Sequence, residues 1–205
     1  MPPVTTPADS RGTPSRTAAQ VLDVAERLAQ TRGFNGFSYA DIASELGITK
    51  ATLHYHFRTK AELGGRLIER YAGTFRAALD AIVAAGAPAP DRLARYARLY
   101  ADVLRNERMC LCGMLAAEYS TLPSPMQEEI RKFFDLNEAW LSTVLEEGRQ
   151  AGTLHFEGPA PEMARLLLGA LEGAMLVARS YADPSRFESA STRLLDDLKP
   201  TPRGR

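Results

Sequence analysis

Apolar side chains recur along most of this chain with a period near 3.6 residues, and no run alternates as a β-strand does. The period predicts a long helix from Leu63 to about Ala85, in which Leu67, Tyr71, Phe75 and Leu79 follow at steps of four. It predicts a second long helix from Met126 to about Gly148 and a very apolar one from Met163 to about Tyr181. Glycine and proline residues separate the segments. The pattern as a whole predicts an all-α protein of about nine helices.

The stretch from Gly33 to Leu63 contains three short helical segments with recognisable start signals. Ser38, Thr49 and Thr59 stand where the helices begin, and a hydroxyl at such an N-cap position accepts a free backbone N–H. Gly47 separates two of the segments, and glycine allows the positive φ of a sharp turn. This order of helix, tight turn and helix is typical of a helix-turn-helix, whose second helix enters the major groove of DNA.

The charge of the whole chain first argues against nucleic acid. Lys and Arg number 25, Asp and Glu also number 25, and the formal net charge is zero. The distribution is uneven, because the chain has no acidic residue between Glu45 and Glu62 but contains Lys50, Arg58 and Lys60 there. A local basic surface favours phosphate contacts. The alternative is a solvated pair of helices on which this charge pattern is accidental.

Several polar or small residues on and beside the helix-turn-helix are candidates for DNA contacts. Lys60, near the start of a helix, would act together with the free N–H groups there, which attract anions. Thr52 and Tyr55 carry groups that reach base edges or phosphates. The full set of candidates is Arg16, Ser38, Tyr39, Thr49, Lys50, Ala51, Thr52, His54, Tyr55, His56 and Lys60.

This stretch resembles the DNA-binding domain of the tetracycline-repressor (TetR) family of bacterial transcriptional regulators. The residues that carry the resemblance are Gly33, Phe37, Ser38, Asp41, Ile42, Ala43, Gly47, Lys50, Leu53, Phe57, Lys60 and Leu63, and the strong match covers roughly residues 17–71. It implies an N-terminal three-helix DNA-binding domain and a C-terminal helical domain that binds a ligand and dimerises. It also implies a homodimeric repressor that a small molecule releases from a palindromic operator on double-stranded DNA.

The sequence departs from the family pattern at two positions. His54 stands where the family often has a tyrosine that touches phosphate, and Ala51 stands where glycine is common. Either Tyr55 replaces the missing tyrosine contact, or His54 itself makes it as a charged group or as a neutral hydrogen-bond donor.

We expect four segments along the chain. Residues 1–15 form a disordered arm, residues 16–62 the DNA-binding domain, residues 63–198 the effector-binding and dimerisation domain, and residues 199–205 a disordered tail. The longest clean apolar run, Met109 to Ala117, is far shorter than the ~20 residues of a membrane-spanning helix. Together with the low cysteine count, this predicts a cytoplasmic protein.

The helix predicted from Met163 carries small residues that let a second helix approach closely. With the last helix it is the candidate dimer interface, for which we name Gly169, Gly173, Leu176 and Leu194. Arg165, Glu172 and Arg179 recur every seven positions and share one face of that helix. We interpret this stripe as solvated or at the rim of an interface.

A ligand cavity would lie among the helices between the DNA-binding domain and the dimer interface. Its candidate lining residues are Phe75, Tyr96, Tyr100, Cys110, Met114, Glu118, Phe133, Asn137 and Trp140. Such a cavity would be mainly apolar with a few polar anchors, which predicts an apolar or aromatic effector. Plain core packing is an equally good interpretation of each aromatic residue. Asn137 lies among apolar neighbours and needs a hydrogen-bond partner.

The two cysteines, Cys110 and Cys112, favour neither a disulfide nor a zinc site at their spacing. Buried, inert thiols are the favoured interpretation. The alternative is a thiol-based redox or electrophile sensor, because Arg105 and Arg108 precede the cysteines and would lower a thiol pKa.

The sequence contains no pattern typical of a catalytic site, a metal site or a cofactor site. It lacks a glycine-rich phosphate loop, a nucleophile elbow and a pair of histidines at metal-ligand spacing in the C-terminal part. We therefore expect no enzyme activity, no metal and no cofactor. A helical small-molecule-binding protein or enzyme of the same fold is the alternative.

Overall fold

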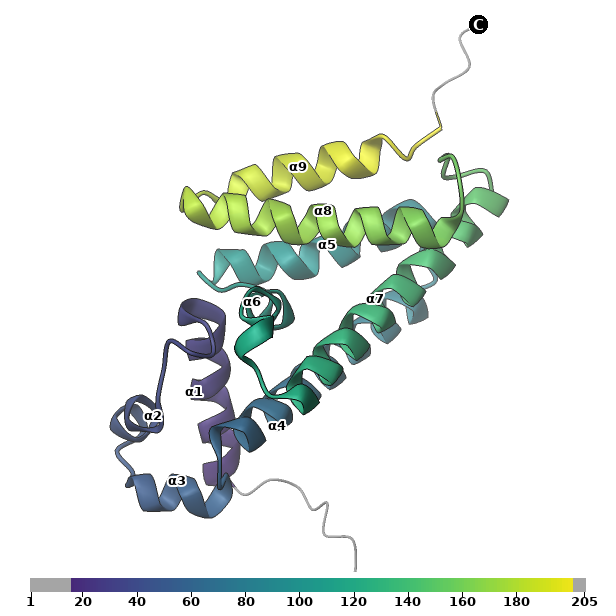
Figure 1. Cartoon of the computed structure of the whole chain (residues 1–205). Coiled ribbons are helices and arrows are strands. Elements are labelled where there is room, and N and C mark those ends of the chain that lie inside the picture. Colours follow the sequence, from purple (N-terminus) through teal and green to yellow (C-terminus); the bar gives the residue numbers. More distant parts are fainter. Residues whose placement is uncertain (1–15, 201–205) are drawn as a thin grey trace, which may run out of the picture.

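The computed structural model describes residues 16–200, and Figure 1 shows their arrangement. The predicted N-terminal arm and most of the predicted tail lie outside the described residues. The described residues form nine α-helices and one short 3₁₀ helix, which confirms the all-α prediction. Their bounds are α1 (Arg16–Arg32), α2 (Tyr39–Leu46), α3 (Lys50–His56), α4 (Lys60–Ala84), α5 (Ala89–Arg105), α6 (Leu111–Ala117), η1 (Tyr119–Thr121), α7 (Ser124–Gln150), α8 (Ala160–Ser180) and α9 (Pro184–Asp196).

Helices α1, α2 and α3 lie together at one end of the molecule, and the long helix α4 leads away from them (Figure 1). α4 packs along α7, α7 packs on α8, and α8 packs on α9. α5 lies against both α7 and α9, while α6 contacts α1 as well as α7. α6 therefore stands between the N-terminal three helices and the C-terminal bundle.

One continuous core joins the two parts of the molecule. A Cβ atom at Gly64 in α4 would lie 2.5 Å from Cε of Met126 in α7 and 2.8 Å from Cζ of Phe34. Phe34 belongs to the loop between α1 and α2, so glycine at position 64 lets this loop and the start of α7 meet on α4. Phe34 and Met126 are both buried. The N-terminal helices are therefore packed against the C-terminal bundle and not merely tethered to it.

Two details at helix ends are not visible in the pattern of apolar residues. α6 begins at Leu111, two residues into the apolar run from Met109 to Ala117, and Cys110 is its N-cap. The backbone N–H of Lys199, placed by the sequence in the tail, donates to the carbonyl of Asp196 at 3.0 Å. No helix among residues 16–200 is long and apolar enough to cross a membrane.

Candidate functional site

The position of α3 is fixed by a turn and two helix caps. Gly47 has φ of 63°, in the left-handed region, and ends α2. The Thr49 hydroxyl accepts the backbone N–H of Thr52 at 3.1 Å, which caps α3. The Thr59 hydroxyl accepts the backbone N–H of Glu62 at 3.1 Å, which caps α4. These contacts confirm the caps expected from the sequence and direct α3 across the end of the molecule.

One face of α3 is buried and the other is open to solvent. Leu53 is fully buried and anchors the helix on the core. Lys50, Ala51 and His54 are exposed. Tyr55 is the most open large apolar side chain of α3, with 84% of its surface exposed. The open face thus presents a cation and two aromatic polar groups that can contact phosphates or base edges.

A concave pocket of about 390 Å³ lies beside this open face. Its lining includes five of the eleven predicted DNA-contact residues, namely Ser38, Tyr39, Lys50, His54 and Lys60. The pocket also adjoins the start of α2, where backbone N–H groups have no helical partner. Two lysines and a helix start border one concavity, which suits a phosphate group.

Several of the predicted contact residues also support the local structure. The Asp41 carboxylate accepts hydrogen bonds from the backbone N–H and the hydroxyl of Ser38, and the side-chain bond is the main cause that lowers the pKa of Asp41. The Tyr39 hydroxyl donates to the Phe57 carbonyl at 2.9 Å, and burial raises the pKa of Tyr39 to about 12. The hydroxyl of Thr52 lies 2.9 Å from that of Thr49.

The remaining contact candidates have more open surroundings. His54 Nδ1 lies 3.1 Å from the carbonyl oxygen of Arg58, and the His54 ring packs against Tyr39. His56 is half-buried and meets the ring of Tyr55 edge-on. Arg16 is exposed at the first position of α1.

Lys60 has a structural role that the sequence does not reveal. Its ammonium group donates to the backbone carbonyls of Phe34 and Phe37. It also lies over both phenylalanine rings, 4.7 and 4.3 Å from their centroids, which is a favourable cation–π arrangement. Burial lowers the pKa of Lys60. The phosphate contact stays a prediction, and Lys60 in addition joins α4 to the loop between α1 and α2.

Glu118, one of the residues that the sequence placed in a ligand cavity, contacts the loop between α1 and α2. Its Oε2 accepts the backbone N–H of Phe34 at 2.7 Å and that of Asn35 at 3.2 Å. The Asn35 side-chain amide donates to the Thr121 hydroxyl at 2.8 Å. The segment that follows α6 therefore holds the loop between α1 and α2.

Arg179 provides a second contact between the two parts of the molecule. Its guanidinium donates to the carbonyls of Gln30 and Thr31 in the last turn of α1, and to Sδ of Met114 at 3.1 Å. The Met109 N–H also donates to the Gln30 carbonyl, at 3.2 Å. A positive group at the C-terminal end of a helix is stabilising. Arg179 is therefore not part of a solvated stripe on α8.

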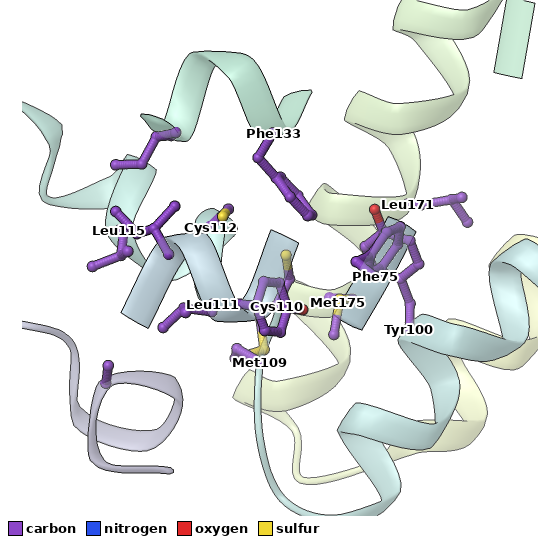
Figure 2. Close-up of a cluster of buried hydrophobic side chains, with 14 of the residues drawn as sticks. Phe75, Tyr100, Met109, Cys110, Leu111, Cys112, Leu115, Phe133, Leu171 and Met175 are labelled. Carbon is purple, nitrogen blue, oxygen red and sulfur yellow. The ribbon is translucent and has the colours of Figure 1, made fainter. Parts of the chain in front are cut away.

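The six aromatic and amide residues predicted to line a ligand cavity do come together, but their side chains pack on one another. Phe75 lies within 5.2–6.1 Å, centroid to centroid, of Tyr96, Tyr100 and Phe133. Tyr96 stacks on Trp140 at 5.3 Å. Figure 2 shows Phe75, Tyr100 and Phe133 among the buried side chains. This group, with Asn137, is called the aromatic cluster below.

Polar groups of the aromatic cluster are only partly satisfied. The Tyr96 hydroxyl donates to Asn137 Oδ1 at 2.8 Å, and Asn137 Nδ2 donates to the Phe133 carbonyl at 2.8 Å. Asn137 therefore has the partners that the sequence required. Trp140 Nε1 is buried and has no hydrogen-bond partner among the described residues.

Cys110 and Cys112 are buried beside the carboxyl group of Glu172. Burial raises the pKa of both thiols, which is the opposite of the effect expected from Arg105 and Arg108. Figure 2 shows both cysteines surrounded by apolar side chains. Thiols in such surroundings are poor nucleophiles. The described residues contain no group of His, Cys, Asp or Glu arranged to hold a metal ion.

Glu172 points inward, which corrects the interpretation of its α8 face as solvated. Its Oε1 is buried without a partner in the described part of the chain. Burial of the carboxyl raises its pKa to about 7. A Cβ atom at Gly113 would lie 2.3 Å from Glu172 Oε2, so glycine at that position makes room for the carboxyl. Arg165, the third residue of the stripe, pairs with Glu138 at 3.2 Å.

A different face of α8 is apolar and open. Leu166, Leu176 and Val177 expose 58%, 51% and 52% of their surface. A Cβ atom at Gly169 or Gly173 would meet no atom within 4 Å. Leu194 on α9 is half-buried at the edge of the same layer. The four predicted interface residues thus lie on the outer layer of the molecule.

Fold and surface together define a regulator that binds DNA through a helix-turn-helix and carries an all-helical C-terminal domain. Family models match both parts of the chain. Residues 21–67 match the bacterial regulatory proteins of the tetR family, and residues 89–194 match the tetracyclin repressor-like C-terminal domain. The chain therefore belongs to the tetR family and is a DNA-binding transcriptional regulator.

Individual relatives agree with this assignment. The chain is 25% identical over 181 residues to the HTH-type transcriptional repressor NemR of Escherichia coli K12, covering 85% of this chain and 89% of that protein. It is 27% identical over 184 residues to the HTH-type transcriptional regulator LmrA of Bacillus subtilis, covering 88% and 95%.

Solved structures extend the likeness to the whole fold. A TetR-family transcriptional regulator from Agrobacterium tumefaciens has a TM-score of 0.88 at 29% identity, over 92% of this chain and all of the other. One from Legionella pneumophila has a TM-score of 0.82 at 31% identity, over 90% and 98%. E. coli NemR in its reduced form has a TM-score of 0.77 at 26% identity, over 92% and 100%.

Proposed function

We propose that this regulator is a cytoplasmic homodimeric repressor that reads a palindromic operator with α3. The open face of α3, with exposed Lys50 and Tyr55 beside the concave pocket, carries the proposal. Base contacts would come from Thr52 and Tyr55. Phosphate contacts would come from the start of α2 and from Lys50, Lys60, His54 and Arg16.

Dimerisation is supported by the open apolar face of α8. Leu166, Gly169, Gly173, Leu176 and Val177 share the outer side of this helix, and the small residues leave space for a second helix. Exposed apolar surface of this kind is typical of a protein interface. In a symmetric dimer two α3 helices would read half-sites about 34–36 Å apart on DNA.

We further propose that a small effector releases the repressor from its operator. Two of the inter-domain contacts, Glu118 with the loop after α1 and Arg179 with the last turn of α1, support a mechanical coupling between the C-terminal bundle and the DNA-binding helices. For an apolar or aromatic effector the aromatic cluster is the candidate site. Its packed state means that such a ligand has to displace side chains.

A gel-shift titration on the DNA upstream of the protein's own gene tests the proposal. We expect saturable, sequence-selective binding at moderate salt, and a weaker complex when both half-sites of the palindrome are disrupted. Equal affinity for the upstream DNA and for a shuffled sequence of the same length would contradict it. A small aromatic compound that raises the melting temperature by mass action would identify an effector.

A thiol sensor is the alternative that the sequence leaves open. Raised pKa values of both buried thiols do not favour it. Treatment with a mild electrophile tests it directly: loss of operator binding in the native chain, but not in Cys110→Ser, would support a thiol sensor. Catalysis by a protein of this fold has no supporting feature among the described residues.

A further inference from the structure

A pocket of about 310 Å³ lies between the two turns that follow α5 and α8. Both helices end in the same way. Glu107 and Ala182 adopt positive φ, of 57° and 50°, and the next residue, Arg108 or Asp183, donates its N–H back to the carbonyl five residues earlier. Residues of both turns line the pocket. None of its lining residues belongs to the aromatic cluster or to the predicted DNA contacts.

Three arginines line the pocket, and two of them have no acidic partner. Arg105 is neutralised by Asp102 and Glu188, with N–O distances of 2.7 and 2.6 Å. Arg108 is half-buried and makes no side-chain hydrogen bond or ion pair with any residue that the structure describes. Among the residues that the structure describes, Arg179 donates only to two backbone carbonyls and a sulfur atom.

Acidic residues in the lining do not compensate these charges. Asp183 accepts the hydroxyl and the backbone N–H of Ser185 and lies 3.6 Å from the Arg186 guanidinium. Glu107 also lines the pocket, but it is exposed and forms no ion pair with any residue that the structure describes. Two lining arginines without a carboxylate partner, at a pocket large enough for a small molecule, favour a ligand with a negative charge.

We propose that this pocket binds a small anionic ligand, through a carboxylate or phosphate group that pairs with Arg108 and Arg179. The consequence for DNA binding rests on the proposed function, whereas the binding itself does not. Arg179 also holds the carbonyls of Gln30 and Thr31 in α1. An anion that attracts this guanidinium therefore weakens its hold on the DNA-binding domain and changes operator affinity.

Isothermal titration with sodium benzoate, sodium acetate and sodium phosphate at constant ionic strength tests the binding step. Benzamide is the matched neutral probe, because it keeps the ring of benzoate and lacks the charge. We expect saturable binding of at least one anion and none of benzamide. Binding of the carboxylates alone, or of phosphate alone, identifies the head group. Equal binding of benzoate and benzamide, or no binding of any anion, overturns the proposal.

Variants locate the site. We expect Arg108→Gln to weaken anion binding at least tenfold and Arg108→Lys, which keeps the charge, to weaken it less. The control is Arg193→Gln, which removes an exposed α9 arginine that is not part of the pocket lining and should leave binding unchanged. Unchanged affinity in Arg108→Gln places the anion elsewhere and overturns the proposal. Melting curves establish that each variant is folded.

A gel shift with saturating anion tests the coupling. Ionic strength is held fixed because DNA binding depends on salt. We expect the anion to change the operator affinity of the native chain and not that of Arg108→Gln. An unchanged affinity in the native chain overturns the coupling step. A protein that shows Arg108-dependent anion binding but no DNA binding without ligand contradicts the proposed function and leaves the anion site standing.

Discussion

Glu118 Oε2 lies 2.7 Å from the backbone nitrogen of Phe34, so a carboxylate beyond the end of α6 holds the loop that follows α1. The two residues are 84 positions apart in the chain. The same oxygen also accepts the N–H of Asn35. Through these two bonds a short segment of the C-terminal domain determines where the loop leading into the helix-turn-helix lies.

Glu118→Ala removes the acceptor of both backbone N–H groups. Because unpaired donors are costly, we expect the free energy of unfolding to fall by about 1–3 kcal/mol, measured by urea denaturation. Glu118→Gln keeps one acceptor oxygen and should lose less. Glu128→Ala, an exposed residue early in α7, serves as the control. Equal stability of Glu118→Ala and the control would refute the role of Glu118.

Lys50 and Lys60 line one pocket but differ in their surroundings, so their variants should separate DNA contact from folding. For Lys50→Ala we expect weaker operator binding and a salt slope reduced by about one, with an unchanged melting temperature. For Lys60→Ala we expect a similar reduction of the salt slope and a loss of affinity that is nearly the same for every DNA sequence. We also expect a lower melting temperature, because the Phe34 and Phe37 carbonyls lose their donor. An unchanged salt slope in Lys60→Ala would show that Lys60 has only a structural role.

Glu172 should make stability depend on pH. Burial raises its pKa from 4.5 to about 7, so the folded state favours the protonated form. The contribution of the protonated Glu172 carboxyl to the free energy of unfolding is fully present below about pH 4.5. It is lost as the pH rises through about 7. Glu172→Gln stays neutral, and its advantage over the native chain should grow between pH 5 and pH 8 by up to about 3 kcal/mol.

Denaturation curves at the two pH values measure this difference. Glu157→Gln changes an exposed residue in the loop before α8 and serves as the control. A difference between Glu172→Gln and the native chain that is the same at pH 5 and pH 8 would show that Glu172 is not the responsible group.

Leu176→Glu should separate the proposed dimer. Half of the Leu176 side chain is exposed on the apolar face of α8, and a charge there would be buried without a partner in a dimer. We expect a monomer in sedimentation and at least a tenfold weaker operator complex. Val83→Glu places the same charge on an exposed site of α4 and should leave the mass unchanged. A dimeric Leu176→Glu would place the interface elsewhere.

Local features of the sequence determined the DNA-binding helices. The hydroxyls of Thr49 and Thr59, the positive φ of Gly47 and the apolar period around Leu53 all act within a few residues. Short-range interactions of this kind can be read along the chain. The helical period likewise determined the number and order of the helices, and the need of Asn137 for a partner.

Only the tertiary structure decided what Lys60, Glu118, Glu172 and Arg179 do. A helical period places a side chain on a face of its helix but does not tell which distant segment covers that face. Arg179 donates to the carbonyl of Thr31, 148 positions away, and Lys60 at the start of α4 donates to that of Phe37, 23 positions away. Long charged side chains extend several ångströms from their helix, so their partners depend on how whole helices pack. The zero net charge of the sequence therefore hides both a basic DNA-binding surface and a pocket with uncompensated arginines.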